Sequence, residues 1–456
     1  MPVELIERPT EHSRPIMLIG PAGIQDAGLT PEAIAWAEAN GFSGQSGRLL
    51  VVPSADGNVA AALFGIGDGK DGTLSLGKLA TTLPAGEWHF STVPSDPTLA
   101  ALALRLGGYV FTRYGKKPGR TVRFALPEGA DADAVGRVAD GVFLARDLIN
   151  TPTNDLGPDA LEEAVRKVAA AHKAKISVVL GDALLAENFP MIHAVGRASA
   201  QAPRLIDLVW GRKGAPKLTL VGKGVCFDTG GLDIKPASGM LLMKKDMGGA
   251  ANVLALATMI MAAKLDVRLR VLIPAVENAI AGNAFRPGDV LPSRKGITVE
   301  IGNTDAEGRL ILADALSLAD EEAPDLLIDM ATLTGAARVA LGPDLPPFYT
   351  DDESLADGIA AAAAQVEDPV WRMPLWKPYE AKLASKIADI NNVTTDGFAG
   401  SITAALFLQR FVEKARSWAH FDIFGWNPSD RPQGPTGGEA QAIRALERVI
   451  AARYAK

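Results

Sequence analysis

Cysteine and histidine are scarce in this chain of 456 residues, which has one cysteine, Cys226, and five histidines. A single cysteine cannot form an intramolecular disulfide, so a small disulfide-stabilised secreted domain is excluded. Structural zinc sites need several closely spaced Cys and His ligands, and the five histidines are scattered, so these sites are excluded as well. At roughly 150 residues per domain, the length allows two or three domains.

The chain also lacks an excess of basic residues and a long apolar run. Lys and Arg number 46 against 53 Asp and Glu, which gives a formal net charge of −7. Bulk electrostatics therefore disfavour nucleic acid and anionic membranes as partners. No apolar run reaches the roughly 18 to 20 residues that span a bilayer, and the first residues lack the apolar region of a secretory signal. We expect a cytoplasmic protein with no membrane partner.

Short apolar runs alternate with helical stretches from residue 15 to about 145, which is typical of an α/β domain. A helix predicted over 131–149 ends in a cluster of helix-breaking residues, and we place a domain boundary in or just before this helix, at roughly residue 145. Beyond it, strands are predicted at 176–180, 205–210, 218–222, 268–275, 297–301, 325–330 and 419–424, and helices at 158–172, 249–263, 309–321, 402–415 and 439–452. We therefore predict an α/β protein with a smaller N-terminal α/β domain (1–145) and a larger C-terminal catalytic domain (146–456), in which helices flank a central mixed sheet.

Residues 221–249, VGKGVCFDTGGLDIKPASGMLLMKKDMGG, combine many glycines with charged side chains among apolar neighbours. Glycine lets the backbone approach a ligand closely, and a charge in apolar surroundings needs a partner or a bound ion. The segment lacks the phosphate-binding pattern G-x-x-x-x-G-K-[ST], and it contains too many carboxylates for an anion-binding loop. Taken alone, it is equally compatible with surface ion pairs and with core packing of its methionines. Its candidate functional residues are Lys223, Asp228, Lys235 and Asp246.

A second segment, 301–310, reads IGNTDAEGRL and places Asp305 and Glu307 two residues apart. An extended backbone directs both carboxylates to one side, which suits a hard cation or an acid–base pair. Acidic loops before helices are also common caps, so this segment alone is weak evidence. Together the two segments supply four carboxylates and three cationic side chains, the last of them Arg309, and indicate a two-metal hydrolytic centre.

These segments, with DMATLTGAARVALG and WAHFDIFGWNP further along, resemble the leucyl aminopeptidases of the two-metal, hexameric type, the cytosol aminopeptidases. The motifs lie in the family's order from about residue 140 to the C-terminus, whereas the first 140 residues carry no motif that we can match. The resemblance implies a metal-dependent aminopeptidase that acts on peptides, prefers leucine-like N-terminal residues and forms a homohexamer. It also implies two divalent ions per subunit, Mn²⁺ or Zn²⁺.

The resemblance further implies a role for each matching residue. Lys223 and Asp246 would hold one ion, Asp228 and Glu307 would bridge both ions, and Asp305 would bind the other. Lys235 would polarise the scissile carbonyl, and Arg309 would hold a bicarbonate that acts as general base. A lysine binds metal only as the neutral amine, so Lys223 must lose its proton, whereas Lys235 should keep its own. Residues matching the substrate pocket or the support of the metal loop are Met243, Asn303, Thr332, Leu333 and Gly335.

Four residues allow a second interpretation. Phe424 and Trp426 are bulkier than the small residues common at this point of the family, which leaves the size of the side-chain pocket open. For Cys226 we favour a buried small side chain over a redox-sensitive thiol. For His420 we favour a structural role over a general base, because its strand-like run is remote from both metal segments.

Two other functions remain alternatives at this point. A two-metal phosphoesterase would use the same residue types, because carboxylates, Lys and Arg also suit phosphoryl oxygens. A non-catalytic, DNA-binding role is known for some members of the family, although the acidic net charge argues against it.

Overall fold

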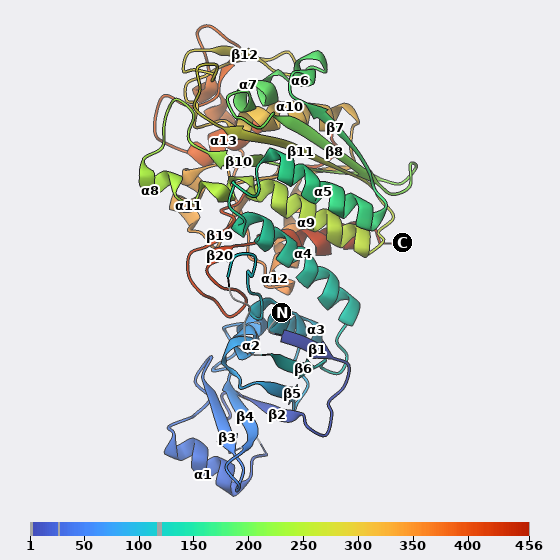
Figure 1. Ribbon diagram of the computed structural model, residues 1–456, viewed down its shortest axis with the longest axis vertical. Helices are drawn as coiled ribbons and strands as arrows, with labels where there is room; N and C mark the ends of the chain where they lie inside the picture. Colours follow the sequence, from blue (N-terminus) through green and yellow to red (C-terminus); the bar gives the residue numbers. More distant parts are fainter. Residues whose placement is uncertain (1–2, 26–27, 116–120, 456) are drawn as a thin grey trace. The chain divides into compact units, whose positions relative to one another are not determined.

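The computed structural model describes residues 3–25, 28–115 and 121–455, and the chain divides into two units (Figure 1). Unit 1 contains Met1–Phe143 and Asn427–Thr436, and unit 2 contains Leu144–Trp426 and Gly437–Lys456. The helix α4 (Ala132–Asn150) runs across the first division. The predicted α/β class with a smaller and a larger part is confirmed.

Unit 1 is built on a six-stranded sheet in the order β1-β6-β5-β2-β4-β3, parallel except for the edge strand β3. Its helices α1 and α3 each begin with proline after a capping side chain, Thr30 and Asp96, that accepts a backbone N–H. The strands are β1 (Val3–Ile6), β2 (Arg14–Ile19), β3 (Leu49–Pro53), β4 (Val59–Gly65), β5 (Gly86–Phe90) and β6 (Val122–Ala125), and the helices are α1 (Pro31–Ala39), η1 (Thr73–Lys78), α2 (Leu79–Thr82) and α3 (Pro97–Gly107).

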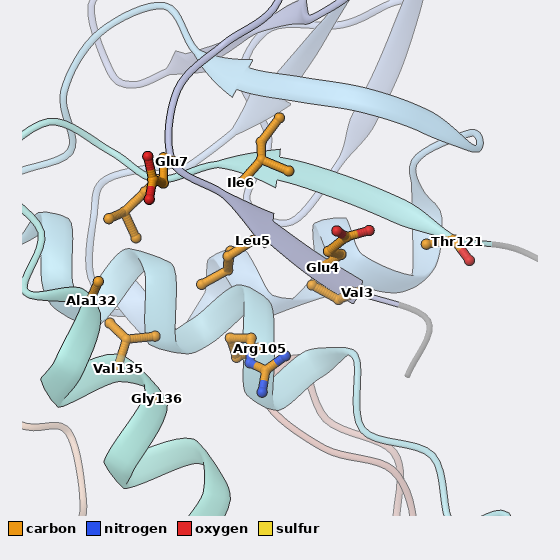
Figure 2. A pocket seen from close by; sticks show the side chains of 11 residues that line it. Val3, Glu4, Leu5, Ile6, Glu7, Arg105, Thr121, Ala132, Val135 and Gly136 are labelled. Carbon is orange, nitrogen blue, oxygen red and sulfur yellow. The ribbon is translucent and has the colours of Figure 1, made fainter.

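A groove in unit 1 lies beside β1, between α3 and the start of α4 (Figure 2). Its lining is mainly apolar, and two of its charged side chains have partners: Arg105 pairs with Asp140 at 3.6 Å, and Glu4 pairs with Arg123 at 3.4 Å. The groove therefore has no cluster of free charges that would suit catalysis.

Unit 2 is built on a nine-stranded mixed sheet in the order β16-β15-β18-β14-β9-β11-β8-β7, with β10 pairing the end of β11. The central strands β18, β14, β9 and β11 are parallel, and β8 is antiparallel to both β11 and β7. At the other edge, β15 is antiparallel to β18 and parallel to β16. Helices α5 and α9 cover one face, and α7 and α10 cover the other (Figure 1). The strands are β7 (Lys175–Leu180), β8 (Arg204–Trp210), β9 (Lys217–Gly222), β10 (Gly224–Asp228), β11 (Arg268–Asn278), β14 (Leu326–Ala331), β15 (Pro347–Tyr349), β16 (Trp371–Arg372) and β18 (Trp418–Asp422).

The helices of unit 2 include α9, which is apolar almost all round and is almost entirely buried between the sheet and neighbouring helices. Two small sheets, β12-β13-β17 and β19-β20, complete the structure. The helices are α5 (Pro158–His172), α6 (Ala183–Ala186), α7 (Pro190–Gly196), α8 (Ala237–Met240), η2 (Met243–Met247), α9 (Gly248–Ala262), α10 (Gly308–Glu321), α11 (Gly335–Leu341), α12 (Glu353–Gln365), η3 (Lys377–Leu383), α13 (Gly400–Gln409) and α14 (Ile443–Arg453). The small strands are β12 (Val290–Pro292), β13 (Thr298–Glu300), β17 (Ile390–Asn391), β19 (Trp426–Asn427) and β20 (Gly437–Gly438).

Some predicted elements differ from the structure. The strand expected at 297–301 is β13, which pairs with β12 and β17 outside the central sheet. The helix expected over 402–415 ends at Gln409, and β10 was not predicted. In the part of the chain that the structure describes, no helix is both long and apolar enough to cross a lipid bilayer.

Candidate active site

The candidate residues gather where the parallel strands of the large sheet end. Asp228 ends β10 and Asn278 ends β11, while Lys223 directly follows β9 and Thr332 directly follows β14. The carboxyl ends of parallel strands are the usual place for a site in an open α/β sheet, because the loops that follow them converge. The sheet topology therefore brings the two charged segments of the sequence to one edge.

Lys223 lies at the break between β9 and β10 and is buried. Its Nζ is 2.7 Å from Asp246 Oδ2 and 2.9 Å from Glu307 Oε1, and it donates a hydrogen bond to the carbonyl oxygen of Thr332. Burial acts to lower the pKa of Lys223, but the carboxylates of Asp246, Glu307 and Asp228 outweigh burial and raise it. The lysine thus holds together carboxylates from two distant segments.

Lys235 pairs with the other carboxylates, Asp228 Oδ2 at 2.9 Å and Asp305 Oδ1. It is carried by a loop that turns back after β10, where Gly230 and Gly231 both have positive φ, 87° and 65°. A Cβ atom on Gly230 would lie 2.4 Å from the carbonyl oxygen of Asp233, so glycine is required at this turn. The neighbouring carboxylates outweigh burial and raise the pKa of Lys235.

Asp228, Asp305 and Glu307 each present one carboxylate oxygen, and these three atoms lie within 4.8 Å of one another. Burial and the neighbouring negative charges raise the pKa of Glu307 to about 8 and that of Asp305 to about 6. Burial acts to raise the pKa of Asp246 as well, but Lys223 and Lys245 outweigh it and lower that pKa. The four acidic residues therefore lie close enough for their charges to interact.

Three oxygens of this cluster, Asp246 Oδ2, Asp305 Oδ1 and Glu307 Oε1, are buried and accept no hydrogen bond of normal geometry, although each lies beside a lysine ammonium. A buried oxygen without a directed donor is costly unless a cation satisfies it. Carboxylate oxygens are ligands of divalent cations, so the donor set fits metal ions.

Arg309 lies in the first turn of α10, is buried, and donates from Nη1 to the carbonyl oxygen of Asn392 at 2.7 Å. Burial lowers its pKa to about 10. Within residues 3–25, 28–115 and 121–455, no carboxylate is within ion-pair distance of its guanidinium, and its Nε has no hydrogen-bond partner. The structure thus joins six of the seven charged candidates directly and leaves Arg309 beside them without an ion pair.

The residues predicted to bind substrate or support the metal loop occupy different places. Met243 begins η2 and Gly335 begins α11. Thr332 donates to Asp246 Oδ1 at 2.7 Å and so braces that carboxylate, while Asn303 accepts the backbone N–H of Asp305 at 2.7 Å and so holds the backbone of that residue. The backbone N–H of Leu333 donates to Asp422 Oδ1 at 3.0 Å.

Several buried polar residues of the site were missed. Asn278 donates from Nδ2 to Asp228 Oδ1 at 2.9 Å and to the carbonyl oxygen of Thr304 at 3.1 Å. Asn392 donates to the carbonyl oxygen of Asn303 at 2.7 Å and accepts from Arg309. Lys245, which precedes Asp246, is buried, and burial lowers its pKa to about 8. A single asparagine or lysine gives no signal in the sequence; the position of Asn278 at the end of an apolar strand was the only available clue.

Cys226 and His420 were both predicted to have structural roles. Cys226 on β10 is fully buried, which confirms the expectation, and burial raises the pKa of its thiol. His420 on β18 is fully buried, with Nδ1 2.5 Å from Asp329 Oδ1 and its ring stacked on Tyr349. This supports a structural role, although Nε2 has no partner among the described residues.

Comparisons with known proteins match both parts of the chain. The model for the catalytic domain of the cytosol aminopeptidase family matches residues 143–447, and the model for the M17 aminopeptidase N-terminal domain matches residues 15–127, where we had found no motif. A probable cytosol aminopeptidase of Geobacter sp. (strain M21) is 37% identical over 486 residues, which cover 96% of this chain and 97% of the relative. Another, from Leifsonia xyli subsp. xyli, is 39% identical, with 94% and 91% covered.

Solved structures give the same result. The crystal structure of a cytosol aminopeptidase from Coxiella burnetii superimposes with a TM-score of 0.94 at 46% identity and covers 99% of both chains. The bottromycin maturation enzyme BotP in complex with Mn has a TM-score of 0.87 at 32% identity, also over 99% of both chains. This chain belongs to the cytosol aminopeptidase family, a family of metal-dependent aminopeptidases.

Proposed function

We propose that this protein removes N-terminal residues from peptides with two divalent cations held by Lys223, Asp228, Asp246, Asp305 and Glu307. The observation that carries the proposal is the convergence of one carboxylate oxygen each from Asp228, Asp305 and Glu307 within 4.8 Å. Buried oxygens of Asp305, Glu307 and the neighbouring Asp246 that lack directed hydrogen bonds support it. Mn²⁺ is the first candidate ion, because the similar enzyme BotP was solved in complex with Mn, and Zn²⁺ is the second. Bound cations would supply a Lewis-acidic centre that acidifies water and polarises the scissile carbonyl.

The residues of the chain have distinct tasks in this proposal. Lys223 must lose its proton to act as a metal ligand. A bound cation would then take over the positive charge that the Lys223 ammonium now places beside Asp246 and Glu307. Lys235 stays protonated beside Asp228 and Asp305, so it can donate to the oxygen of the scissile carbonyl as negative charge develops there.

Arg309 is suited to hold a small anion. Its Nε has no hydrogen-bond partner and its Nη1 is fixed by Asn392. A guanidinium can bind two oxygens of a carboxylate or bicarbonate through parallel N–H groups. We assign to Arg309 a bicarbonate that accepts a proton from the attacking water.

The finer assignments are part of the same proposal. Residues 146–456 carry the chemistry, and 1–145 form the N-terminal domain. Met243, Leu333 and Gly335 border the substrate side chain, with leucine-like residues as the first substrates to test, while Asn303 and Thr332 support the metal-site residues. The protein acts in the cytoplasm as a homohexamer, which light scattering on the purified protein will test.

The decisive experiment is hydrolysis of leucyl-p-nitroanilide and a panel of unblocked peptides with Mn²⁺ or Zn²⁺, with and without a chelator. We expect release that stops on chelation, returns with metal, and is absent in the Asp305→Ala/Glu307→Ala variant. p-Nitrophenyl phosphate serves as the counter-substrate for a phosphoesterase. Absence of metal-dependent release from every peptide would overturn the proposal.

A further inference from the structure

Lys245 is a buried cation that forms no ion pair with any residue that the structure describes. The residue is 5% exposed, and among the side chains that the structure describes no carboxylate lies within ion-pair distance of its ammonium. The contact of its Nζ is with the ring of Phe424, 4.6 Å from the ring centroid. A cation–π contact stabilises a buried ammonium less than a carboxylate does, so the charge remains only partly compensated.

A second cation, Arg338 on the exposed side of α11, lies over the same ring, with its Cζ 5.1 Å from the centroid. The nearby carboxylate of Asp422 forms no ion pair with either cation among the described residues and stabilises the charge of Lys245 only in part, because its oxygens already accept three hydrogen bonds. It accepts from the backbone N–H groups of Leu333 and Thr334 and from the hydroxyl of Thr334. Lys245, Arg338 and Phe424 therefore form a positively charged patch, which we call the Phe424 patch.

The Phe424 patch lies beside the metal-site carboxylates. Lys245 directly precedes Asp246 in η2. Gly425 has φ 67°, and a Cβ atom added to it would lie 3.3 Å from Thr332 Cγ2 and 3.8 Å from the Cα of Gly248, so this turn packs against the residues that brace Asp246. The side-chain oxygen of Gln441 accepts hydrogen bonds from the backbone N–H groups of both Phe424 and Gly425 at 2.9 Å, which holds the backbone that carries the ring.

The same elements carry the residues assigned to the substrate side chain in the proposed function. Met243 and Lys245 share η2, and Gly335 and Arg338 share α11. A substrate side chain that reaches Met243 and Gly335 therefore comes to the same two short helices that carry the two cations. Phe424 and the two cations over its ring add bulk and positive charge beside these helices, which disfavours a purely apolar pocket.

We infer that the Phe424 patch binds the carboxylate of an acidic side chain, so that peptides beginning with Glu or Asp are preferred substrates. The inference rests on the proposed aminopeptidase function and names its substrate class. The carboxylate of a bound substrate would form ion pairs with Lys245 and Arg338. Hydrogen bonds between charged groups are the strongest kind, so these contacts would favour acidic substrates.

The test compares the p-nitroanilides of Glu, Gln, Asp, Asn and Leu at fixed Mn²⁺. These substrates lack a free α-carboxylate, and Glu and Gln have the same shape, so the Glu to Gln ratio of kcat/KM reports the side-chain charge alone. We expect this ratio to be at least about 10 and to fall at least about tenfold in Lys245→Met, because a site built for one polar group rejects its neutral analogue by such factors. High salt should lower the ratio as well.

The matched control is Lys244→Met, which removes the neighbouring charge of η2. Lys244 donates to the carbonyl oxygen of Asn150 and contacts Trp426 rather than Phe424, so its variant should keep the Glu to Gln ratio. If Lys245→Met does not fold, as judged by circular dichroism, Arg338→Gln on the surface of α11 takes its place and should lower the ratio. Release from leucyl-p-nitroanilide together with a Glu to Gln ratio near 1 would overturn this inference and leave the aminopeptidase proposal intact, whereas no release from any substrate would overturn both.

Discussion

Gly308 lies directly against the side chain of Lys223. A Cβ atom added to Gly308 would be 2.5 Å from Cε and 2.7 Å from Nζ of Lys223. Gly308 begins α10 immediately after Glu307, so the missing Cβ leaves the space through which the lysine reaches both Glu307 and Asp246.

Gly308→Ala is therefore expected to displace the Lys223 ammonium from its carboxylates. Metal affinity and kcat should each fall by at least about tenfold, as when a residue that orients metal ligands is lost. Unfolding should require roughly 1–3 kcal/mol less, because the core is overpacked. Titration calorimetry with Mn²⁺, hydrolysis of leucyl-p-nitroanilide and denaturant unfolding measure the three effects. The control is Gly358→Ala in α12, where an added Cβ meets nothing within 4 Å; equal behaviour of the two variants would contradict the argument.

Asn278→Ala removes the two hydrogen bonds that fix the positions of the Asp228 carboxylate and the Thr304 carbonyl oxygen. The loss leaves Asp228 Oδ1 with one fewer donor, so we expect Mn²⁺ affinity to fall roughly 10- to 100-fold with the fold retained. Asn283→Ala, at an exposed residue that also donates to a carbonyl oxygen, is the control. Unchanged Mn²⁺ affinity in Asn278→Ala would show that Asp228 does not depend on this brace.

Lys235→Met should reduce kcat far more than it changes KM for leucyl-p-nitroanilide. The ammonium that would stabilise the developing oxyanion is lost, and removal of one such donor costs roughly 10²–10³ in kcat. Lys235→Arg should not restore activity, because a planar guanidinium cannot pair with Asp228 and Asp305 as a compact ammonium does. Retention of more than about a tenth of wild-type kcat in Lys235→Met would contradict this role.

In the presence of a chelator, stability should fall as pH rises from about 5 to 8. The pKa of Glu307, about 8 in the folded protein, is above the ordinary carboxylate value, so the folded state holds a proton that the unfolded state has released. Unfolding free energy then decreases with pH by at most about 1.4 kcal/mol per unit for this proton. Glu307→Gln should remove this part of the slope. Metal affinity should change in the opposite direction, because a ligand carboxylate must be deprotonated. A slope identical in wild type and Glu307→Gln would refute the assignment.

The sequence by itself determined the chemistry and the class of fold. Period-two apolar runs and amphipathic stretches are local features, so most strands and helices of the large sheet could be predicted within a few residues. The charged candidate residues could also be predicted from the sequence. Residues such as Lys223 and Asp246 stand in apolar, glycine-rich segments, where an unpaired charge is costly.

Only the tertiary structure decided which side chains meet. The register of β9, β14 and β11 brings Lys223, Thr332 and Asn278 to one edge of the sheet, and no local pattern encodes that register. The brace of Asn278, the contact of Gly308 with Lys223 and the cations over Phe424 all join residues distant in sequence. Side-chain contacts of this kind depend on the order of the strands and on gaps of a few ångströms between packed residues. Both are properties of the folded molecule and not of any local stretch of sequence.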